Sequence, residues 1–158
     1  PGDPENLEAQ AAARYWPLVF GSDFVRDRHS SGANSLLNYG YTVLRACVAR
    51  YVMAAGLHPS IGLHHHNRFN AFCLVDDVME PFRPLVDRAV KTLVDRGTIE
   101  VEADAKTALV DVLSVSVELD TGFVPLTRAI ERLAQSIAAS ALASKSDLSL
   151  PVAGRFFR

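Results

Sequence analysis

The sequence predicts a mainly helical, all-α fold in which several helices surround one central helix. Two observations support this: apolar residues recur at three- and four-residue spacing over long stretches, and proline and glycine fall between those stretches. A hydrophobic content of 49% with 22% charged residues is typical of a globular domain, and 158 residues are enough for one core. We therefore expect a helical domain over residues 1–145. A tail over residues 146–158 would be disordered or would dock on a partner chain.

The first two helices are predicted from their boundaries. Asp3 and Pro4 suit the N-cap and first turn of a helix, and the alanine-rich run that follows is expected to end near Pro17. The central helix is expected over residues 34–55, because its apolar positions keep helical spacing as far as Gly56.

The third predicted helix contains a bend. It begins after Asn70 and is expected to end at Gly97, with apolar residues at helical spacing on one side. Two prolines, Pro81 and Pro84, follow Glu80 closely, and proline removes a backbone donor and disfavours helical angles in the residue before it. We therefore expect the helix to bend near Glu80.

The last part of the domain is also expected to be helical. Residues 98–102 alternate between apolar and polar side chains, which indicates at most a short strand or extended link. Two helices are predicted after it, over residues 105–119 and 125–142, because buried-type residues recur there at helical spacing.

The net charge of the chain argues against nucleic-acid binding, but the distribution of the charges along the sequence is compatible with it. The formal net charge is −2. Between residues 9 and 75, however, six arginines stand against two acids, and 13 of the 16 basic residues in the chain are arginine. Arginine is the side chain that best forms forked contacts with phosphate. A general bias toward arginine over lysine in the source genome explains the second observation equally well.

The cysteines and the hydrophobic pattern indicate where in the cell the protein is expected. Cys47 and Cys73 lie in apolar helical settings, which is typical of reduced core thiols. No apolar run approaches the ~20 residues that a membrane span requires. We therefore expect a cytoplasmic protein with no membrane partner.

Candidate site residues concentrate in residues 62–84. This stretch contains three consecutive histidines, His64–His66, followed by Asp76, Asp77 and Glu80. Asp77 and Glu80 are three residues apart, so on a helix their carboxylates share a face. Carboxylate oxygens with a neutral imidazole suit Mg²⁺ or Mn²⁺ better than a thiolate site would. Successive residues cannot all face one centre, so the three histidines cannot all bind one ion.

The same stretch carries a family resemblance. Gly-Leu-His-His, then Asn-x-Phe, then Asp-Asp-Val-Met-Glu-Pro-Phe-Arg-Pro strongly resembles the catalytic region of the CRISPR-associated spacer integrases, and is most similar to their type II versions. The runs Asn-x-Glu-Ala…Ala-x-x-Tyr-Trp and Asn-Ser-Leu-Leu-Asn-Tyr-Gly-Tyr resemble further segments of that family. The resemblance covers roughly residues 6–90.

The resemblance implies a set of metal ligands. By position in the motifs, Glu8, His65 and Glu80 would be the catalytic residues and would bind Mg²⁺ or Mn²⁺, with Asp77 as an auxiliary acid. Judged without the family pattern, Glu8 is better explained as a surface glutamate of a helix. Glu5 is a competing candidate that falls too early in the pattern.

The resemblance also implies contacts with DNA. Asn34 and Asn38 share a helix face, where their amides would bind phosphate or support the metal ligands, or would instead cap a neighbouring loop. Arg45, Arg68 and Arg83 would position phosphates rather than read bases.

The implied function is that of a metal-dependent DNA endonuclease and integrase. It would join the 3′ ends of spacer DNA into a CRISPR repeat array during CRISPR adaptation. The implied partners are double-stranded DNA, a small second CRISPR adaptation protein and, in the full-length family, a second copy in a homodimer. The family also has an N-terminal β-rich domain, and we expect the present chain to be the catalytic domain without it.

Other classes of site are less consistent with the sequence. A di-iron carboxylate bundle needs Glu-x-x-His pairs on two helices, and a zinc hydrolase needs His-Glu-x-x-His or a compact set of three histidines. Neither motif occurs here. The remaining alternative is a truncated, non-catalytic helical scaffold that binds DNA or partners in the adaptation complex.

Overall fold

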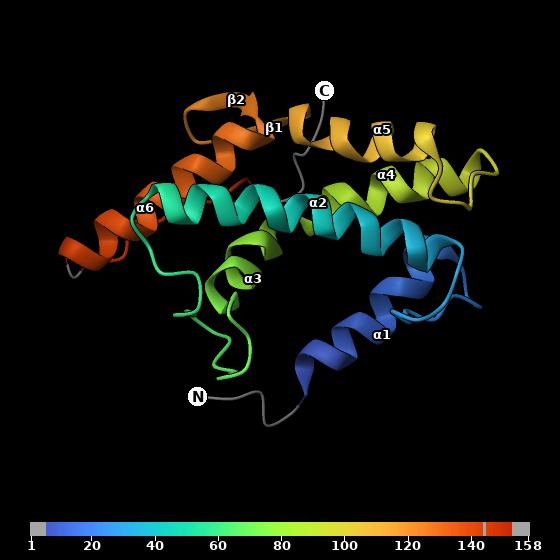
Figure 1. Cartoon of the computed structure of the whole chain (residues 1–158), viewed down its shortest axis with the longest axis horizontal. Coiled ribbons are helices and arrows are strands. Elements are labelled where there is room, and N and C mark those ends of the chain that lie inside the picture. Colours follow the sequence, from blue (N-terminus) through green and yellow to red (C-terminus); the bar gives the residue numbers. More distant parts are fainter. Residues whose placement is uncertain (1–5, 144, 153–158) are drawn as a thin grey trace.

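The computed structural model describes residues 6–143 and 145–152. Within these ranges it contains six α-helices, two short 3₁₀ turns and one two-stranded hairpin (Figure 1). The mainly helical fold that the sequence predicts is confirmed. In chain order the elements are α1 (Leu7–Phe20), α2 (Ala33–Ala54), α3 (Cys73–Met79), η1 (Glu80–Phe82), α4 (Arg83–Asp95), α5 (Ala103–Asp111), η2 (Val112–Ser114), β1 (Ser116–Leu119), β2 (Gly122–Pro125) and α6 (Leu126–Ala143).

Helix α2 is the central element. It packs against α3, α4, α5 and α6, and Figure 1 shows it crossing the molecule between α3 and the α4–α5 pair. Its apolar stripe includes Leu36, Leu44 and Val48, all of which are fully buried. Gly40 lies where α2 meets α4, and a Cβ there would come within 2.5 Å of Val86 Cγ1. A glycine at this position therefore allows the two helices to pack closely.

The predicted bend lies between α3 and α4. Residues 80–82 form the 3₁₀ turn η1, which holds Glu80 at the joint between the two helices. Pro81 lies in the first turn of η1 and Pro84 in the first turn of α4, where a missing N–H costs least. The joint lets α3 and α4 each bury its own apolar face against α2.

Helix α1 departs from the prediction at its C-terminal end. It does not end near Pro17 but continues to Phe20, and the Gly21 N–H donates to the Pro17 carbonyl at 3.0 Å. The rings of Trp16, Phe20 and Phe24 stack with centroids 4.7–6.0 Å apart, which favours keeping this turn helical. The predicted cap at Asp3 and Pro4 lies outside the described residues.

The hairpin is the main error of the sequence prediction. Of the two forms expected for residues 98–102, the structure has the link and not the strand, whereas the helix predicted over 105–119 ends at Asp111. The chain from Ser116 to Pro125 instead forms the antiparallel pair β1–β2. Along β1, Val117 and Leu119 are buried and alternate with more exposed residues, and the turn places Gly122 at φ 105°. This conformation favours glycine over other residues.

Part of the predicted tail lies on the domain. The Val152 N–H donates to the Glu118 carbonyl at 2.9 Å, and the Ser149 N–H donates to Ser136 Oγ at 3.0 Å. Residues 153–158 of the tail lie outside the described residues. None of the described helices combines the length and apolar character that a membrane span requires.

Candidate functional site

The loop that carries His65 folds around the carboxylate of Asp77. Asp77 Oδ2 accepts the N–H groups of Leu63 at 2.5 Å and His64 at 2.9 Å, and Oδ1 accepts the His65 N–H at 3.2 Å. His65 Nδ1 lies 2.5 Å from the same Oδ1. Only 6% of the Asp77 side chain is exposed, although the residue as a whole is half-buried. Three backbone donors around one oxygen pair form a small anion-binding nest.

The close turn of this loop depends on Gly62. A Cβ at residue 62 would lie 2.1 Å from the His65 carbonyl oxygen, 2.9 Å from Cys73 Cβ and 3.0 Å from Asp77 Oδ2. Any side chain there would therefore force the loop open. Glycine lets the loop close tightly enough for its N–H groups to reach Asp77.

Electrostatics keep Asp77 charged. Burial by itself would raise the pKa of Asp77, but hydrogen bonds from the His64 N–H and from the ring and N–H of His65 lower it, and the net shift is downward. A charged Asp77 accepts the hydrogen of His65 Nδ1, which leaves Nε2 as the nitrogen suited to bind a metal.

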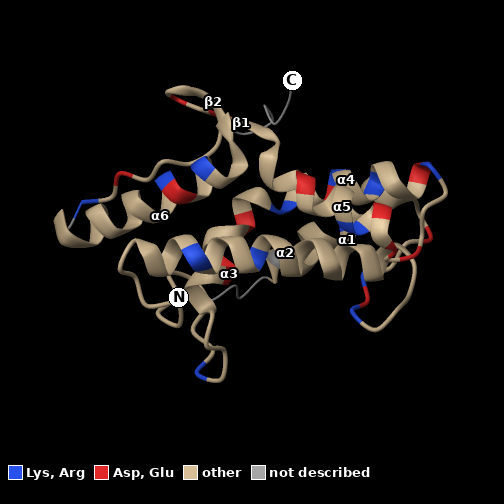
Figure 2. Ribbon diagram, turned by 45° about the horizontal axis from the view of Figure 1, so that its top comes forward, with Lys and Arg blue, Asp and Glu red and all other residues tan. Residues whose placement is uncertain are grey.

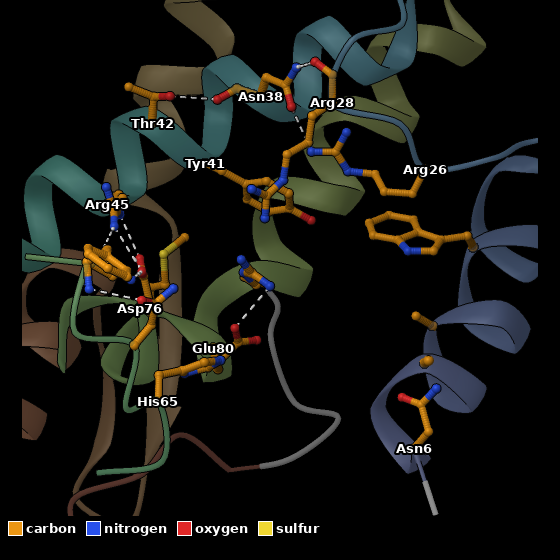
Figure 3. Close-up of a pocket in the computed structure, with 18 residues that line it drawn as sticks. Asn6, Arg26, Arg28, Asn38, Tyr41, Thr42, Arg45, His65, Asp76 and Glu80 are labelled. Atoms are coloured by element: carbon orange, nitrogen blue, oxygen red, sulfur yellow. Dashed lines mark hydrogen bonds and ion pairs between the residues drawn. The ribbon is translucent and has the colours of Figure 1, made fainter. Parts of the chain in front are cut away.

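Glu80 lines the same pocket as His65. It lies in η1, with 44% of its side chain exposed, and its Oε1 is 3.0 Å from Arg83 Nη1. Figure 3 shows His65 and Glu80 on one side of the pocket, with Asn6, which precedes α1, across from them.

The third predicted ligand, Glu8, belongs to α1. Its side chain lies outside what the structure describes, so only its place in the first turn of the helix is known. Ala9 and Ala12, which follow it, line the pocket, so this part of α1 forms the wall facing His65. Among the described residues no group of three histidine, cysteine, aspartate or glutamate side chains could hold a metal. Glu8, whose side chain is outside the described set, is not among those residues.

The pocket between these walls has a volume of about 1200 Å³. Pockets for drug-sized ligands span roughly 300–1,000 Å³, so this one has room for a larger substrate. Its described lining includes four arginines, Arg26, Arg28, Arg45 and Arg83, against the two carboxylates of Asp76 and Glu80. Over the ribbon as a whole, both charge signs are interspersed (Figure 2). The local excess of positive charge therefore lies in the pocket lining.

Arg45 is held by Asp76. Its Nε and Nη2 donate to the two Asp76 oxygens at 2.6 and 2.9 Å, Asn70 Nδ2 donates to Asp76 Oδ2 at 2.7 Å, and the guanidinium lies over the Phe72 ring at 4.8 Å. Burial alone would raise the pKa of Asp76, but the bonds from Arg45 and Asn70 lower it overall. These contacts fix the end of the loop that begins at His65. The predicted DNA contact of Arg45 stays a prediction.

The predicted DNA-binding amides hold the connector before α2. Asn34 is 5% exposed; its Oδ1 accepts from Arg26 Nη1 at 2.8 Å and from the Asp27 N–H at 2.9 Å. Asn38 Oδ1 accepts from Arg26 Nη2 at 2.7 Å, and its Nδ2 donates to the Arg28 carbonyl at 2.9 Å. Of the two roles that the sequence left open, the contacts seen here are those of loop-capping amides.

The other two predicted DNA-binding arginines are placed differently. Arg83 lies over the Tyr41 ring at 5.0 Å, and its Nε is buried with no hydrogen-bond partner among the described residues. Arg68 is exposed in the loop after the histidines, 4.6 Å from the Phe69 ring. Phe69 lines the pocket, so Arg68 lies near its edge.

Sequence reasoning considered Asp87 only as an acid that Arg83 could hold, and it missed that Asp87 is buried between two tyrosines. It is 3% exposed on α4 and accepts hydrogen bonds from Tyr15 Oη at 2.7 Å and from Tyr41 Oη. Burial raises the pKa of Asp87, against the opposite effect of the tyrosine hydrogen bonds and of two nearby arginines. Burial, together with Asp87, raises the pKa of both tyrosines. The sequence did offer one signal of this burial, because Asp87 is a charged residue on the apolar stripe of a predicted helix.

The fold and the pocket therefore define a helical domain with a histidine and a glutamate in an arginine-lined cavity. A solved chain titled "Casposase bound to integration product" has the same fold, with a TM-score of 0.76 over 96% of the present chain and 50% of that chain, at 22% identity. The family described as "CRISPR associated protein Cas1" matches residues 5–113. The chain belongs to this Cas1 family, which confirms the resemblance.

Individual relatives agree with this assignment. A CRISPR-associated endonuclease Cas1 of Neisseria meningitidis is 38% identical over 140 residues, which cover 87% of the present chain and 46% of the relative. A second such protein, from Pyrobaculum aerophilum, is 34% identical over 146 residues, covering 87% and 48% of the two chains. The present chain spans about half the length of these curated relatives.

Proposed function

We propose that this chain is the helical catalytic part of a divalent-metal-dependent DNA nuclease and integrase that joins spacer DNA 3′ ends into a CRISPR repeat. The observation that carries the proposal is the arrangement of the pocket. His65, oriented by Asp77, and Glu80 line an arginine-rich cavity that α1, the helix of Glu8, borders from the other side. The two relatives described above are named endonucleases, and the solved chain of the same fold is titled as bound to an integration product.

The donor chemistry of the site fits Mg²⁺ or Mn²⁺. Glu8, His65 and Glu80 would hold the ion through two carboxylates and one imidazole, a set that hard divalent cations accept. Asp77 would act by fixing the His65 ring, as a carboxylate behind a metal-binding histidine does. When bound there, the ion would polarise the scissile phosphate and lower the pKa of the attacking hydroxyl.

The arginines would position DNA rather than read its sequence. Arg83 lies beside Glu80 and Arg68 near the pocket edge, where each could contact a phosphate. Arg45 would need to exchange its contacts with Asp76 to do the same. The bound DNA would be a spacer end and a repeat, in an assembly with a second copy and a small second adaptation protein.

The test compares the wild type with His65→Ala, in metal binding and in cleavage or joining of branched DNA. The exposed neighbour His66→Ala is the matched control. We expect wild type and control to cut or join the DNA with Mn²⁺, and His65→Ala to lose that activity. Mn²⁺ at about 100 times its dissociation constant should stabilise the wild type by about 2.7 kcal/mol, and His65→Ala by much less. Equal activity of the two histidine variants would refute the assignment. A wild type with neither activity nor stabilisation by Mn²⁺ would indicate the scaffold alternative.

A further inference from the structure

Helix α1 forms one wall of the pocket, although none of its described side chains is buried. Its C-terminal half carries the contacts that dock it. Tyr15 Oη donates to Asp87 Oδ2 on α4 at 2.7 Å, and Trp16 and Phe20 stack in the aromatic cluster. The first turn, where Glu8 lies, is seven residues before Tyr15, or about 10 Å along the helix axis at 1.5 Å per residue.

Asp87 also contacts the opposite wall. Its second oxygen accepts the hydroxyl hydrogen of Tyr41 on α2. The ring of Tyr41 lies under the guanidinium groups of Arg26 and Arg83, at 5.7 and 5.0 Å. Arg83 in turn pairs with Glu80 at 3.0 Å. A continuous series of contacts therefore runs from α1, through Asp87 and Tyr41, to the turn that carries Glu80.

A carboxylate at this place is costly for the fold. An apolar side chain would fill a position on the buried stripe of α4 without the desolvation that a charge suffers. The acid is useful because its two oxygens fix two hydroxyls from two other helices at hydrogen-bonding distance. The benefit is geometric.

We propose that Asp87 is a positioning residue that sets the separation of the two pocket walls, through Tyr15 on α1 and through Tyr41 and Arg83 beside Glu80. A tilt of α1 by about 10° at Tyr15 would move its first turn by about 2 Å, given the length of the lever. Metal–ligand distances tolerate only about 0.2 Å. The effect of Asp87 on metal binding rests on the proposed function, whereas its effect on the docking of α1 does not.

The experiment measures hydrogen exchange of α1 and Mn²⁺ binding in the 158-residue chain. The test variants are Tyr15→Phe, which removes one hydroxyl, and the triple variant Tyr15→Phe/Tyr41→Phe/Asp87→Leu. The triple variant removes the two hydroxyls together with the carboxylate they bind, so none of these three groups is left without its partner, and such replacements often keep or raise stability. The control is Asp95→Asn, at an exposed ion pair with Lys91 on the same helix.

We expect amide exchange in residues 7–20 to rise by about tenfold in both test variants, the factor for one lost hydrogen bond to a charged group. Exchange in α6 should stay unchanged. The Mn²⁺ concentration for half-maximal thermal stabilisation should rise by about tenfold or more, because a shift of about 2 Å in the first turn of α1 exceeds the variation of about 0.2 Å that metal–ligand distances tolerate. The control should match the wild type in both measurements.

The two proposals fail differently. Wild-type exchange of α1 and wild-type Mn²⁺ affinity in a folded triple variant would overturn the role of Asp87, while leaving the proposed function standing. A wild type without a Mn²⁺ response would refute the proposed metal site, and the exchange of α1 would then decide the role of Asp87 alone.

Discussion

The glycine in front of the histidines offers the sharpest test of the site geometry. In Gly62→Ala the added Cβ would lie 2.1 Å from the His65 carbonyl oxygen, and it would also press on Cys73 and Asp77 at 2.9 and 3.0 Å. Ordinary contacts begin at 3.4 Å. The backbone at His65 must therefore retreat by about 1 Å, and a displacement of that size can lower catalysis by about 100-fold.

The effect on stability should be moderate. Overpacking of this kind costs about 1–3 kcal/mol, and the reduced freedom of the unfolded chain offsets about 0.4–1 kcal/mol. A net loss of about 1–2 kcal/mol lowers the melting temperature by about 2–8 °C for a chain of this size. The variant should thus stay folded at 25 °C while losing most of its activity.

The assay measures Mn²⁺-dependent cleavage of branched DNA and the melting temperature of the same samples. Ala129→Val is the matched control, because Ala129 is fully buried in α6, which is not part of the histidine loop, and the added methyl groups overpack the core there. It should lose similar stability and retain wild-type rates. Wild-type rates in Gly62→Ala, or an equal loss in both variants, would refute the role assigned to the tight turn.

Three further predictions address the residues around the site. Asp77→Asn should weaken Mn²⁺ binding by about 10–100-fold, because the His65 ring loses its orienting acceptor; thermal shift with Mn²⁺ measures this, and an unchanged midpoint would contradict it. Asp76→Asn should lower the unfolding free energy at pH 7 by about 2 kcal/mol through the weakened contact with Arg45. The pKa of Asp76 is lowered in the fold, so this stabilisation is present above the unfolded pKa of ~3.9 and is lost as pH falls through the folded pKa. Urea unfolding measured from pH 7 to 3 should therefore show a smaller acid-induced loss of unfolding free energy in the variant than in the wild type. If the unfolding free energies of the two proteins fall in parallel with pH, the pairing is refuted. Asn34→Ala should cost about 2 kcal/mol in urea unfolding, because it removes the shared acceptor of two part-buried donors, Arg26 Nη1 and the Asp27 N–H, and a loss below about 0.5 kcal/mol would contradict that role.

The sequence was sufficient for elements whose signals are local. Helix α2 ends at Ala54, one residue before the predicted end at residue 55, and Gly56 follows with φ 78°. The bend near Glu80 followed from two prolines whose restrictions act on adjacent residues. The hairpin was missed although Val117 and Leu119 alternate with polar residues before a glycine, because the preceding helical spacing was extended through them.

The site could be predicted only in part. His65 and Glu80 do line one pocket, but their part in metal binding stays a prediction, as does that of Glu8. Tyr15 and Asp87 are 72 residues apart, and no local pattern indicates that they meet. Such pairings depend on how α1 docks on α4, which is a property of the whole fold.

The central position of α2 has a consequence for synthesis of the chain. The helices that bury its apolar stripe all follow it in the sequence, and 41 residues separate its end at Ala54 from the end of α4 at Asp95. At about 5–20 residues per second, the ribosome needs about 2–8 s to make that segment. An isolated helix with an apolar face is marginally stable and prone to associate during such an interval. The half of the domain that is made first thus depends on the half made last for protection from aggregation.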